Sequence, residues 1–590
     1  MQTSPKIKPI LCPTIHIKSL YTYKDFLRKR PQPQHTSNFK FSWQTSPSTE
    51  IPSSHTNALI KLRRSLTLLK HIQAIDLRDV QVRTPPKCYP ILESIFKKLS
   101  KTPTIQLTRP EDETQFEIYF TKKWVRYLSK LGNISYKLAS LRFPLQFQEG
   151  KDIQGLFKYL KYCPKIISLA MTALGNGSQI SETFLKLKEC PCSLKHLAID
   201  SLLDREENPD FITIPFEHFA RLESLKLALN LNFSYNFLAH NITQLSRLSN
   251  LRELSINFMG EIIPGLGLGL NTLAQRKTLK KLSLIFHDNL FIGEKTLKDL
   301  QGFSQLTHLA LRVYISDLKS LKLISECFQN MKELEYLKLI IIKQHSFKST
   351  DNLQILCEEI NLLENLRHLK LSFELLGFSM QKETITSFIP HLQKTFTKQA
   401  KLETLSFTCA QIDSAQALLD LSSVLKDSRA SLKKLKMNFE NGFLDKQAQH
   451  SIINFIRNLE NIRILKLPGI GIDSQNFLDQ VVQGIALLKY LRAFEIGKIS
   501  KEITKSGYLE AIEAILTKRG LRRFRCETSQ LIFESSVKGK GLVERSSQKA
   551  DIMDFEKIVR RNPSLENLEL AKYPFDLHFS HQFCNWEEGV

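Results

Sequence analysis

The sequence predicts an α/β solenoid in which one short strand and one helix recur along the chain. Three observations support this prediction. A six-residue phrase with aliphatic residues at its first, fourth and sixth positions recurs, its copies start at an almost constant interval, and apolar residues at helical spacing lie between them. Seven consecutive copies start 28, 28, 29, 28, 27 and 28 residues apart, at Ile166, Leu194, Leu222, Leu251, Leu279, Leu306 and Leu334.

The repeated phrase has the pattern of a strand that is buried on one side. At strand period two, its fourth and sixth residues share a face, and its third and fifth residues point the other way. Burying each such aliphatic side chain contributes roughly 1.5–3 kcal/mol, but only when the neighbouring unit is present. We therefore expect Leu197, Leu225, Leu254 and Leu282 to pack in one ladder of core residues.

The segments after the strands are expected to be helices. Leu353, Leu356 and Ile360 recur at helical spacing after one phrase, and residues 477–487 do so after another. A helix is ~10 Å wide, whereas neighbouring strands lie ~4.8 Å apart, so a stack of such units must bend. The prediction is a horseshoe with a parallel sheet on its inner side and helices on its outer side.

This L-x-x-L-x-L phrase with a period of about 28 residues is the signature of leucine-rich repeats. Over residues 138–572 it resembles the ribonuclease-inhibitor-like class of leucine-rich repeat proteins. The resemblance implies a surface for partners and does not itself name one. In that class an Asn or Cys usually follows the sixth position by three residues. Among the seven regular units only Asn230 fits, so the geometry of the turns is open.

The phrase continues beyond residue 339 at more variable intervals. Further copies start at Leu366, Leu402, Leu432, Ile462, Leu491, Leu521 and Leu565. Looser copies occur at 72–77, 105–107 and 138–143, and the longest interval holds a flexible insertion at 537–549. We therefore predict a disordered basic leader at 1–55, degenerate N-terminal repeats or a cap at 56–137, the solenoid at 138–572 and a C-terminal tail at 573–590.

The composition is that of a soluble, folded and strongly basic chain. Of its 590 residues, 42% are hydrophobic and 24% are charged, and the formal net charge is +24. This charge favours acidic partners, although it also fits a solvated lysine-rich surface. No apolar run approaches the ~20 residues of a membrane span. The ten scattered cysteines and the lack of a clear secretory signal predict a cytoplasmic or nuclear protein, with a mitochondrial presequence in the leader as the alternative.

Signals for catalysis, cofactors or metals are weak, so the sequence predicts none of them. The phosphate-binding G-x-x-x-x-G-K-[ST] motif, H-E-x-x-H and G-x-S-x-G do not occur. The glycines of 265–269 follow a repeat strand and are expected to form a bend. His578, His581 and Cys584 have helix-compatible spacing but lack an evident fourth ligand, and we interpret them as tail residues.

Basic and aromatic residues recur at the third and fifth positions of the phrase, which face away from the core. On the concave side they would form a positive stripe that binds a partner, most simply an acidic protein, and the protein would serve as a non-catalytic scaffold. The alternative is nucleic acid, with phosphates on the cations and bases stacked on the rings. The predicted partner-binding residues are His196, Lys226, Lys281, His308, Tyr336, Lys338, His368, Lys370, Lys434, Lys436, Lys466, Arg523 and Arg525.

A third interpretation concerns the interval from Pro90 to Leu128. Residues 90–99 and 124–128 resemble the two ends of an F-box, a module that often precedes leucine-rich repeats and implies substrate recognition in a ubiquitin ligase. Between them, residues 109–114 break the helical apolar pattern that an F-box needs. Degenerate capping repeats are the alternative for this interval.

Overall fold

A computed structural model gives the fold as two compact units, Met1–Ile263 with Gly267–Leu279 and Phe286–Leu290, and Pro264–Leu266 with Lys280–Ile285 and Phe291–Val590. The residues that the structure describes are 15–17, 38–41, 74–76, 104–106, 140–146, 168–175, 185–189, 193–203, 214–230, 241–259, 270–286, 294–315, 318–343, 351–375, 401–409, 431–439, 442–444, 446–459, 461–500, 502–518, 520–528, 567–572 and 575–580.

In the second unit each copy of the phrase forms a strand that pairs in parallel with the strand of the next copy. These strands are β10 (Lys281–Phe286), β11 (His308–Ile315), β12 (Tyr336–Lys343), β13 (His368–Leu375), β14 (Thr404–Cys409), β15 (Lys434–Phe439), β17 (Ile464–Leu467), β19 (Ala493–Ile499), β20 (Arg523–Thr528) and β21 (Asn567–Lys572). Strand β22 (Phe575–Ser580), in the predicted tail, pairs antiparallel with β21 and ends the ladder. Two short strands, β16 (Gly442–Phe443) and β18 (Ile470–Gly471), pair separately.

The first unit repeats the same parallel arrangement. Its longer strands are β5 (Ser140–Gln146), β6 (Ser168–Gly175), β7 (His196–Leu203), β8 (Ser224–Asn230) and β9 (Glu253–Met259), which pair in sequence order. The 3-10 helices η2 (Leu187–Glu189) and η3 (Phe216–Phe219) and the short helix α9 (Asn271–Gln275) lie between strands or follow them.

Four short strands near the N-terminus form a further parallel sheet in the first unit. They are β1 (Ile15–Ile17), β2 (Asn38–Phe41), β3 (Ala74–Asp76) and β4 (Thr104–Gln106). The last two coincide with the looser copies of the phrase. The first two fall within 1–55, where the sequence predicts a disordered leader. These two stretches are strands instead, because apolar residues alternate along both, and the rest of that prediction lies outside the described residues.

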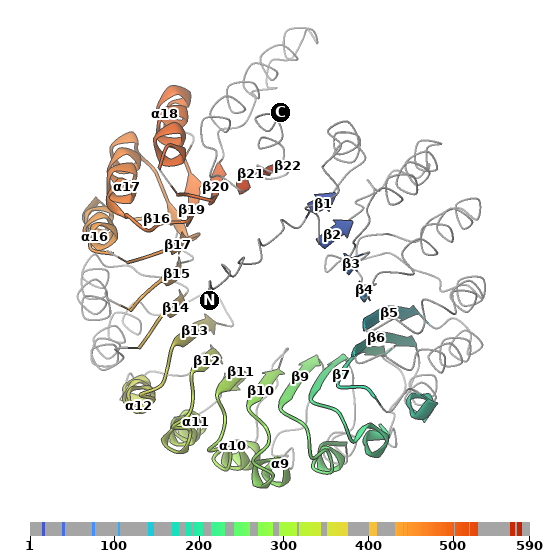
Figure 1. Ribbon diagram of the computed structural model, residues 1–590. Coiled ribbons are helices and arrows are strands. Elements are labelled where there is room, and N and C mark those ends of the chain that lie inside the picture. Colours follow the sequence, from blue (N-terminus) through green and yellow to red (C-terminus); the bar gives the residue numbers. More distant parts are fainter. Residues whose placement is uncertain are drawn as a thin grey trace, which may run out of the picture. The chain divides into compact units, whose positions relative to one another are not determined.

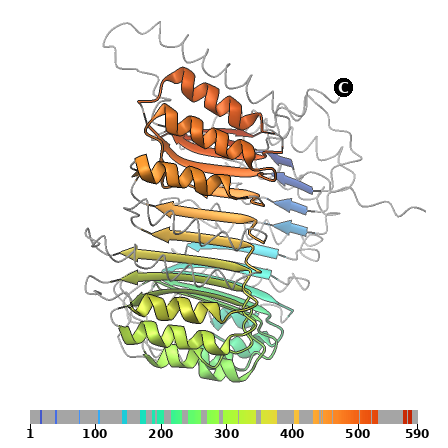
Figure 2. The ribbon, with the colours of Figure 1, turned by 90° about the vertical axis from the view of Figure 1, so that its left-hand side faces the viewer.

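Helices occupy the segments between the strands of the second unit. Those described are α10 (Glu294–Leu300), α11 (Leu318–Asn330), α12 (Asp351–Asn361), α16 (Lys446–Arg457), α17 (Gln475–Leu487) and α18 (Lys505–Leu516). The helices predicted around residue 356 and over 477–487 are confirmed as α12 and α17. Helices α10 to α12 pack in sequence order, as do α16 to α18, and Figures 1 and 2 show them on one side of their strands.

The core lies between these strands and helices. Leu197, Leu225 and Leu254 occupy one register on β7, β8 and β9 and are at most 1% exposed. Leu282 on β10 is equally buried and pairs in register with Leu309 of β11. The predicted ladder of fourth-position leucines is therefore present in each unit, and it is built from the residues that the phrase indicated.

A backbone link connects successive phrases at the start of their strands. The carbonyl oxygen of the second position accepts hydrogen bonds from the N–H groups of the second and third positions of the next phrase. Thus Lys280 accepts from Thr307 and His308 at 2.9 and 3.1 Å, and Thr307 accepts from Glu335 and Tyr336 at 2.9 and 3.0 Å. The link uses main-chain atoms only, so it fixes register without requiring a particular side chain.

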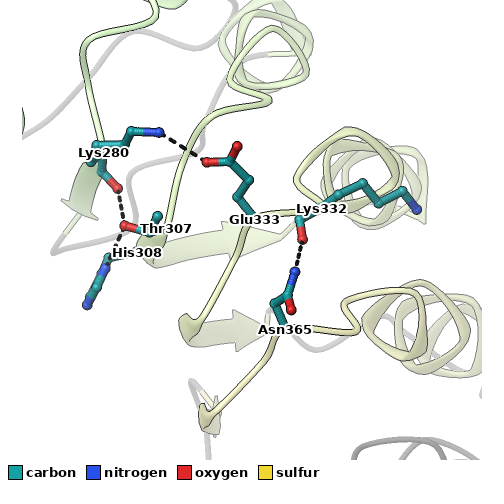
Figure 3. A network of polar contacts seen from close by, with 6 residues as sticks. All are labelled: Lys280, Thr307, His308, Lys332, Glu333 and Asn365. Carbon is teal, nitrogen blue, oxygen red and sulfur yellow. Dashed lines mark hydrogen bonds and ion pairs between the residues drawn. The ribbon is translucent and has the colours of Figure 1, made fainter. Parts of the chain in front are cut away.

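An asparagine just before the phrase adds a side-chain link between successive repeats. The Asn365 amide donates to the Lys332 carbonyl at 3.0 Å (Figure 3), and the Asn250 amide donates to the Ala220 carbonyl at 2.9 Å. The resembled class usually places an asparagine after the strand. In these two repeats the asparagine that satisfies a loop carbonyl precedes the strand.

Several predicted features fall outside the described residues. They include the F-box-like interval apart from β4, the glycines at 265–269, the insertion at 537–549, and His581 and Cys584. His578, which the sequence analysis interprets as a tail residue, lies on strand β22. Among the described residues, no helix is both long and apolar enough to span a membrane.

Candidate partner-binding face

The third and fifth positions of the phrase form two rows across the strands of the second unit, and we call the surface they share the open face. In the first row, pairing places in register Lys281, His308, Tyr336, His368, Thr404, Lys434, Ile464, Ala493 and Arg523. In the second it places Ser283, Ala310, Lys338, Lys370, Ser406, Lys436, Lys466, Glu495 and Arg525. Eleven of the thirteen predicted partner-binding residues therefore lie in these rows.

The other two predicted residues, His196 and Lys226, belong to the first unit. Both side chains are exposed, on the neighbouring strands β7 and β8. His196 is in register with Ser224, and Lys226 is in register with Ala198. They occupy the expected positions of the phrase, but the open face is made of strands of the second unit alone, so these two residues do not enter the site.

Aromatic side chains dominate the part of the first row on β11 to β13. The rings of His308 and Tyr336 stack at 5.5 Å between centroids, and His368 lies tilted at 6.1 Å from Tyr336. The Lys370 ammonium lies over the Tyr336 ring, 5.3 Å from its centroid. His308 comes from the strand before Tyr336 and Lys370 from the strand after it, so side chains of both neighbouring strands contact this ring.

A polar contact at the start of β11 holds the His308 ring. The Thr307 hydroxyl donates to the Lys280 carbonyl at 3.2 Å, and its lone pairs face Nδ1 of His308 at 3.0 Å (Figure 3). The same close-up shows the Lys280 ammonium bonded to the Glu333 carboxylate, at 3.0 Å. The imidazole is thus oriented by the backbone link between successive phrases.

Further along the rows the open face is basic. Lys370, Lys434, Lys436, Lys466 and Arg523, from strands β13, β15, β17 and β20, make up what we call the basic cluster. The pKa of Lys434 is lowered, first because burial removes water from its ammonium group and then because the other four cations repel it. Among the ion pairs found in the described residues, none neutralises Lys434 or Lys436.

One carboxylate lies within the second row and pairs with a cation on each side. Glu495, whose side chain is only 12% exposed, accepts a hydrogen bond from the Lys466 ammonium at 2.5 Å. Its other oxygen lies 3.8 Å from Nε of Arg525 on the next strand. These contacts make Glu495 an internal counter-ion that a ligand carboxylate would have to compete with.

A third row of charged residues occupies the second position of the phrase, outside the two rows predicted from the sequence. Second-position residues lie immediately before the strands, and three successive ones are arginines: Arg463, Arg492 and Arg522. All three are exposed. The same position-by-position comparison of the phrases would have found them in the sequence. They were missed because the second position shares its strand parity with the core and was not considered as surface.

The described residues of the open face offer charged and aromatic side chains for binding, and no catalytic arrangement is found among them. Within the part of the chain that the structure describes, there is no group of three His, Cys, Asp or Glu side chains able to hold a metal ion. Cys327, Cys357 and Cys526 are buried thiols. Burial raises the pKa of Cys327 to about 12, which disfavours its nucleophilic thiolate form.

Comparisons with known proteins show a distant likeness to solved structures. No protein-family model matches the chain, and no curated protein matches it. Among solved structures, it is similar to the crystal structure of the leucine-rich repeat-containing protein LegL7 from Legionella pneumophila, with 11% sequence identity and a TM-score of 0.29. This match covers 52% of the chain and 89% of that protein. The repeated parallel register and intervening helices of this chain are what support a leucine-rich repeat fold.

Proposed function

We propose that this chain is a non-catalytic interaction protein whose open face binds an acidic protein. The proposal includes the finer architecture that the phrase predicts, a horseshoe of the ribonuclease-inhibitor-like class with the sheet inside. In that geometry the open face is concave and the basic cluster lines it. The helices are wider than the strand spacing, which supports curvature in this sense.

The crowding of cations around Lys434 is the observation that carries the proposal. Five cations from four strands share one surface, and partial burial, followed by repulsion from the other four cations, lowers the pKa of Lys434. Like charges placed this close destabilise an isolated sheet. An acidic partner would remove that repulsion on binding, so part of its affinity would come from relief of an unfavourable feature of the free protein.

Nucleic acid is the alternative occupant, and the aromatic residues argue against it. Stacking of bases on a protein requires an accessible ring face. His308 stacks on Tyr336 and the Lys370 ammonium lies over the same ring, so a base would have to compete with both side chains for it.

The test is charge reversal in the basic cluster. Lys434→Glu combined with Lys436→Glu should weaken binding of a fluorescent twenty-residue polyglutamate peptide by at least about tenfold, because two attractive contacts become repulsive. Lys322→Glu combined with Lys446→Glu changes the net charge equally on exposed helix positions, and it should leave the affinity nearly unchanged. Fluorescence anisotropy measures both affinities.

A single-stranded RNA of the same length serves as the competing probe. Its affinity for a true nucleic-acid site would fall steeply with salt, with a logarithmic slope of about −0.7 per phosphate contact. RNA binding that exceeds peptide binding at physiological salt would overturn the proposed partner class. Equal peptide affinities for the cluster variant and the helix-control variant would overturn the proposed site.

A further inference from the structure

The second-position side chains follow one edge of the sheet, which we call the strand-start edge. The carbonyl link places them in succession, since each second-position N–H donates to the second-position carbonyl of the preceding phrase. Arg463 donates to Lys433 at 2.7 Å, and Arg492 donates to Arg463 at 2.8 Å. Residues one phrase apart in the sequence are therefore direct neighbours along this edge.

Elsewhere along this edge, opposite charges alternate and pair. Lys195 and Glu223 form an ion pair at 2.6 Å in the first unit. In the second unit Glu403 pairs with Lys433 at 3.0 Å and with Arg367 at 3.9 Å. The hydrogen bonds from Lys195 and from Lys433 are the main reason why the pKa values of Glu223 and Glu403 are lowered. At these positions the charges along the edge therefore neutralise one another.

This alternation stops after Lys433. The next positions are Arg463 and Arg492, which are exposed, and the row continues at Arg522. In the described part of the chain, neither Arg463 nor Arg492 has an acidic partner. Two like charges on adjacent strands repel each other, so an anion from outside would be favoured between them. Arginine suits that role because its planar guanidinium can bind a carboxylate through two parallel hydrogen bonds.

The turn that leads into Arg492 also exposes apolar side chains. Leu487, the last residue of α17, is 60% exposed, and Tyr490 is 56% exposed. The turn is tight, since the Leu491 N–H donates to the Leu488 carbonyl at 3.3 Å. Exposed apolar groups beside cations fit a ligand that carries both carboxylates and apolar side chains.

We propose that Arg463 and Arg492, together with Leu487 and Tyr490, anchor an acidic amphipathic helix of the partner at the strand-start edge. This inference rests on the proposed function, because the same partner would continue onto the basic cluster. Carboxylates one helical turn apart have Cβ atoms ~5–6 Å from each other, which suits neighbouring strands ~4.8 Å apart. Same-side residues of an extended chain are ~6.6–6.8 Å apart and match less well.

Two peptides of equal charge test this proposal by fluorescence anisotropy on the full chain. One is a helical peptide with Glu at i and i+4 and Leu beside them, and the other is polyglutamate. Arg463→Lys with Arg492→Lys keeps the charge but removes the forked donors, and it should weaken the helical peptide about fivefold. Leu487→Ser with Tyr490→Ser should weaken the helical peptide and leave polyglutamate unchanged.

Charge reversal separates this proposal from the proposed function. Arg463→Glu with Arg492→Glu should weaken the helical peptide about tenfold or more, relative to Lys322→Glu with Lys446→Glu. If this edge variant binds like wild type while Lys434→Glu with Lys436→Glu binds weakly, the edge site is wrong and the open-face function stands. If neither variant loses affinity, both proposals are wrong. Tight RNA binding that either reversal abolishes, without peptide binding, overturns the protein partner.

Discussion

Replacing Glu495 by glutamine is expected to lower the stability of the second unit and to raise its affinity for acidic ligands. The carboxylate is the internal counter-ion of Lys466, at 2.5 Å, and lies 3.8 Å from Arg525. Glutamine keeps the shape and one oxygen acceptor but removes the negative charge. The two cations then repel each other and become available to a ligand.

The expected loss of stability lies between that of an exposed ion pair and that of a buried one. Glu495 is only 12% exposed, whereas Lys466 and Arg525 are 37% and 44% exposed. Exposed pairs contribute ~0.2–1 kcal/mol, and breaking a fully buried pair costs ~3–5 kcal/mol. We therefore expect a loss of about 1–2 kcal/mol in unfolding free energy. Once the Glu495 charge is removed, these two cations can form exposed ion pairs with an acidic peptide, whose affinity should rise about two- to tenfold.

Thermal unfolding followed by circular dichroism measures the first effect, and peptide anisotropy measures the second. Glu364→Gln provides the control, since this exposed glutamate has no ion pair within the described residues. A drop in melting temperature of about 1.5–3 °C is expected for the Glu495 variant, given the size of the second unit. An unchanged peptide affinity would refute competition between Glu495 and the ligand, and an unchanged melting temperature would refute the stabilising pair.

Three further predictions concern the scaffold and its charge. Gly497→Ala should cost at least about 1–3 kcal/mol, because a Cβ would lie 2.3 Å from the Pro468 carbonyl oxygen. Gly484→Ala in α17 should cost less than Gly497→Ala, because its Cβ would come within 3.2 Å of the Ile456 side chain and of no backbone atom, and because alanine favours a helix; urea unfolding compares the two. Leu337→Ala should cost ~2–5 kcal/mol by the same measurement, since this core side chain is fully buried. Lys434→Met should stabilise the protein at pH 7 and do so less as the pH rises toward 10.5, because the lowered pKa of Lys434 makes its proton bind more tightly in the unfolded chain; melting curves from pH 7 to 10 would contradict this if the difference stayed constant.

The sequence was sufficient for the repeat and for the two faces of each strand. The aliphatic phrase alone indicated that Leu225 and Leu254 are buried. It also indicated that Lys434 and Lys436 lie on the face of their own strand that points away from the core, since strand geometry alternates side chains strictly. Spacing also predicted helices α12 and α17. These features depend on local periodicity, which a single sequence displays directly.

Contacts between side chains of neighbouring phrases could not be predicted from periodicity. That Glu495 pairs with both Lys466 and Arg525, or that His308 and Lys370 contact Tyr336, depends on register and on side-chain conformations of three strands at once. The arginines of the strand-start edge were overlooked for a different reason. Their position shares its parity with the core, yet Arg463 and Arg492 precede the regular strand, where alternation no longer decides which side chain is exposed.

The main-chain link between successive strand starts also determines where this chain can change length. The link recurs from Lys280 to Arg522, although the linked residues are between 27 and 36 positions apart. The differences in length therefore lie in the connections between one strand start and the next. Lengthening or trimming a helical connection would leave the spacing of the lysines and arginines intact, so such a protein could be reshaped at its periphery while continuing to present the same pattern of charge.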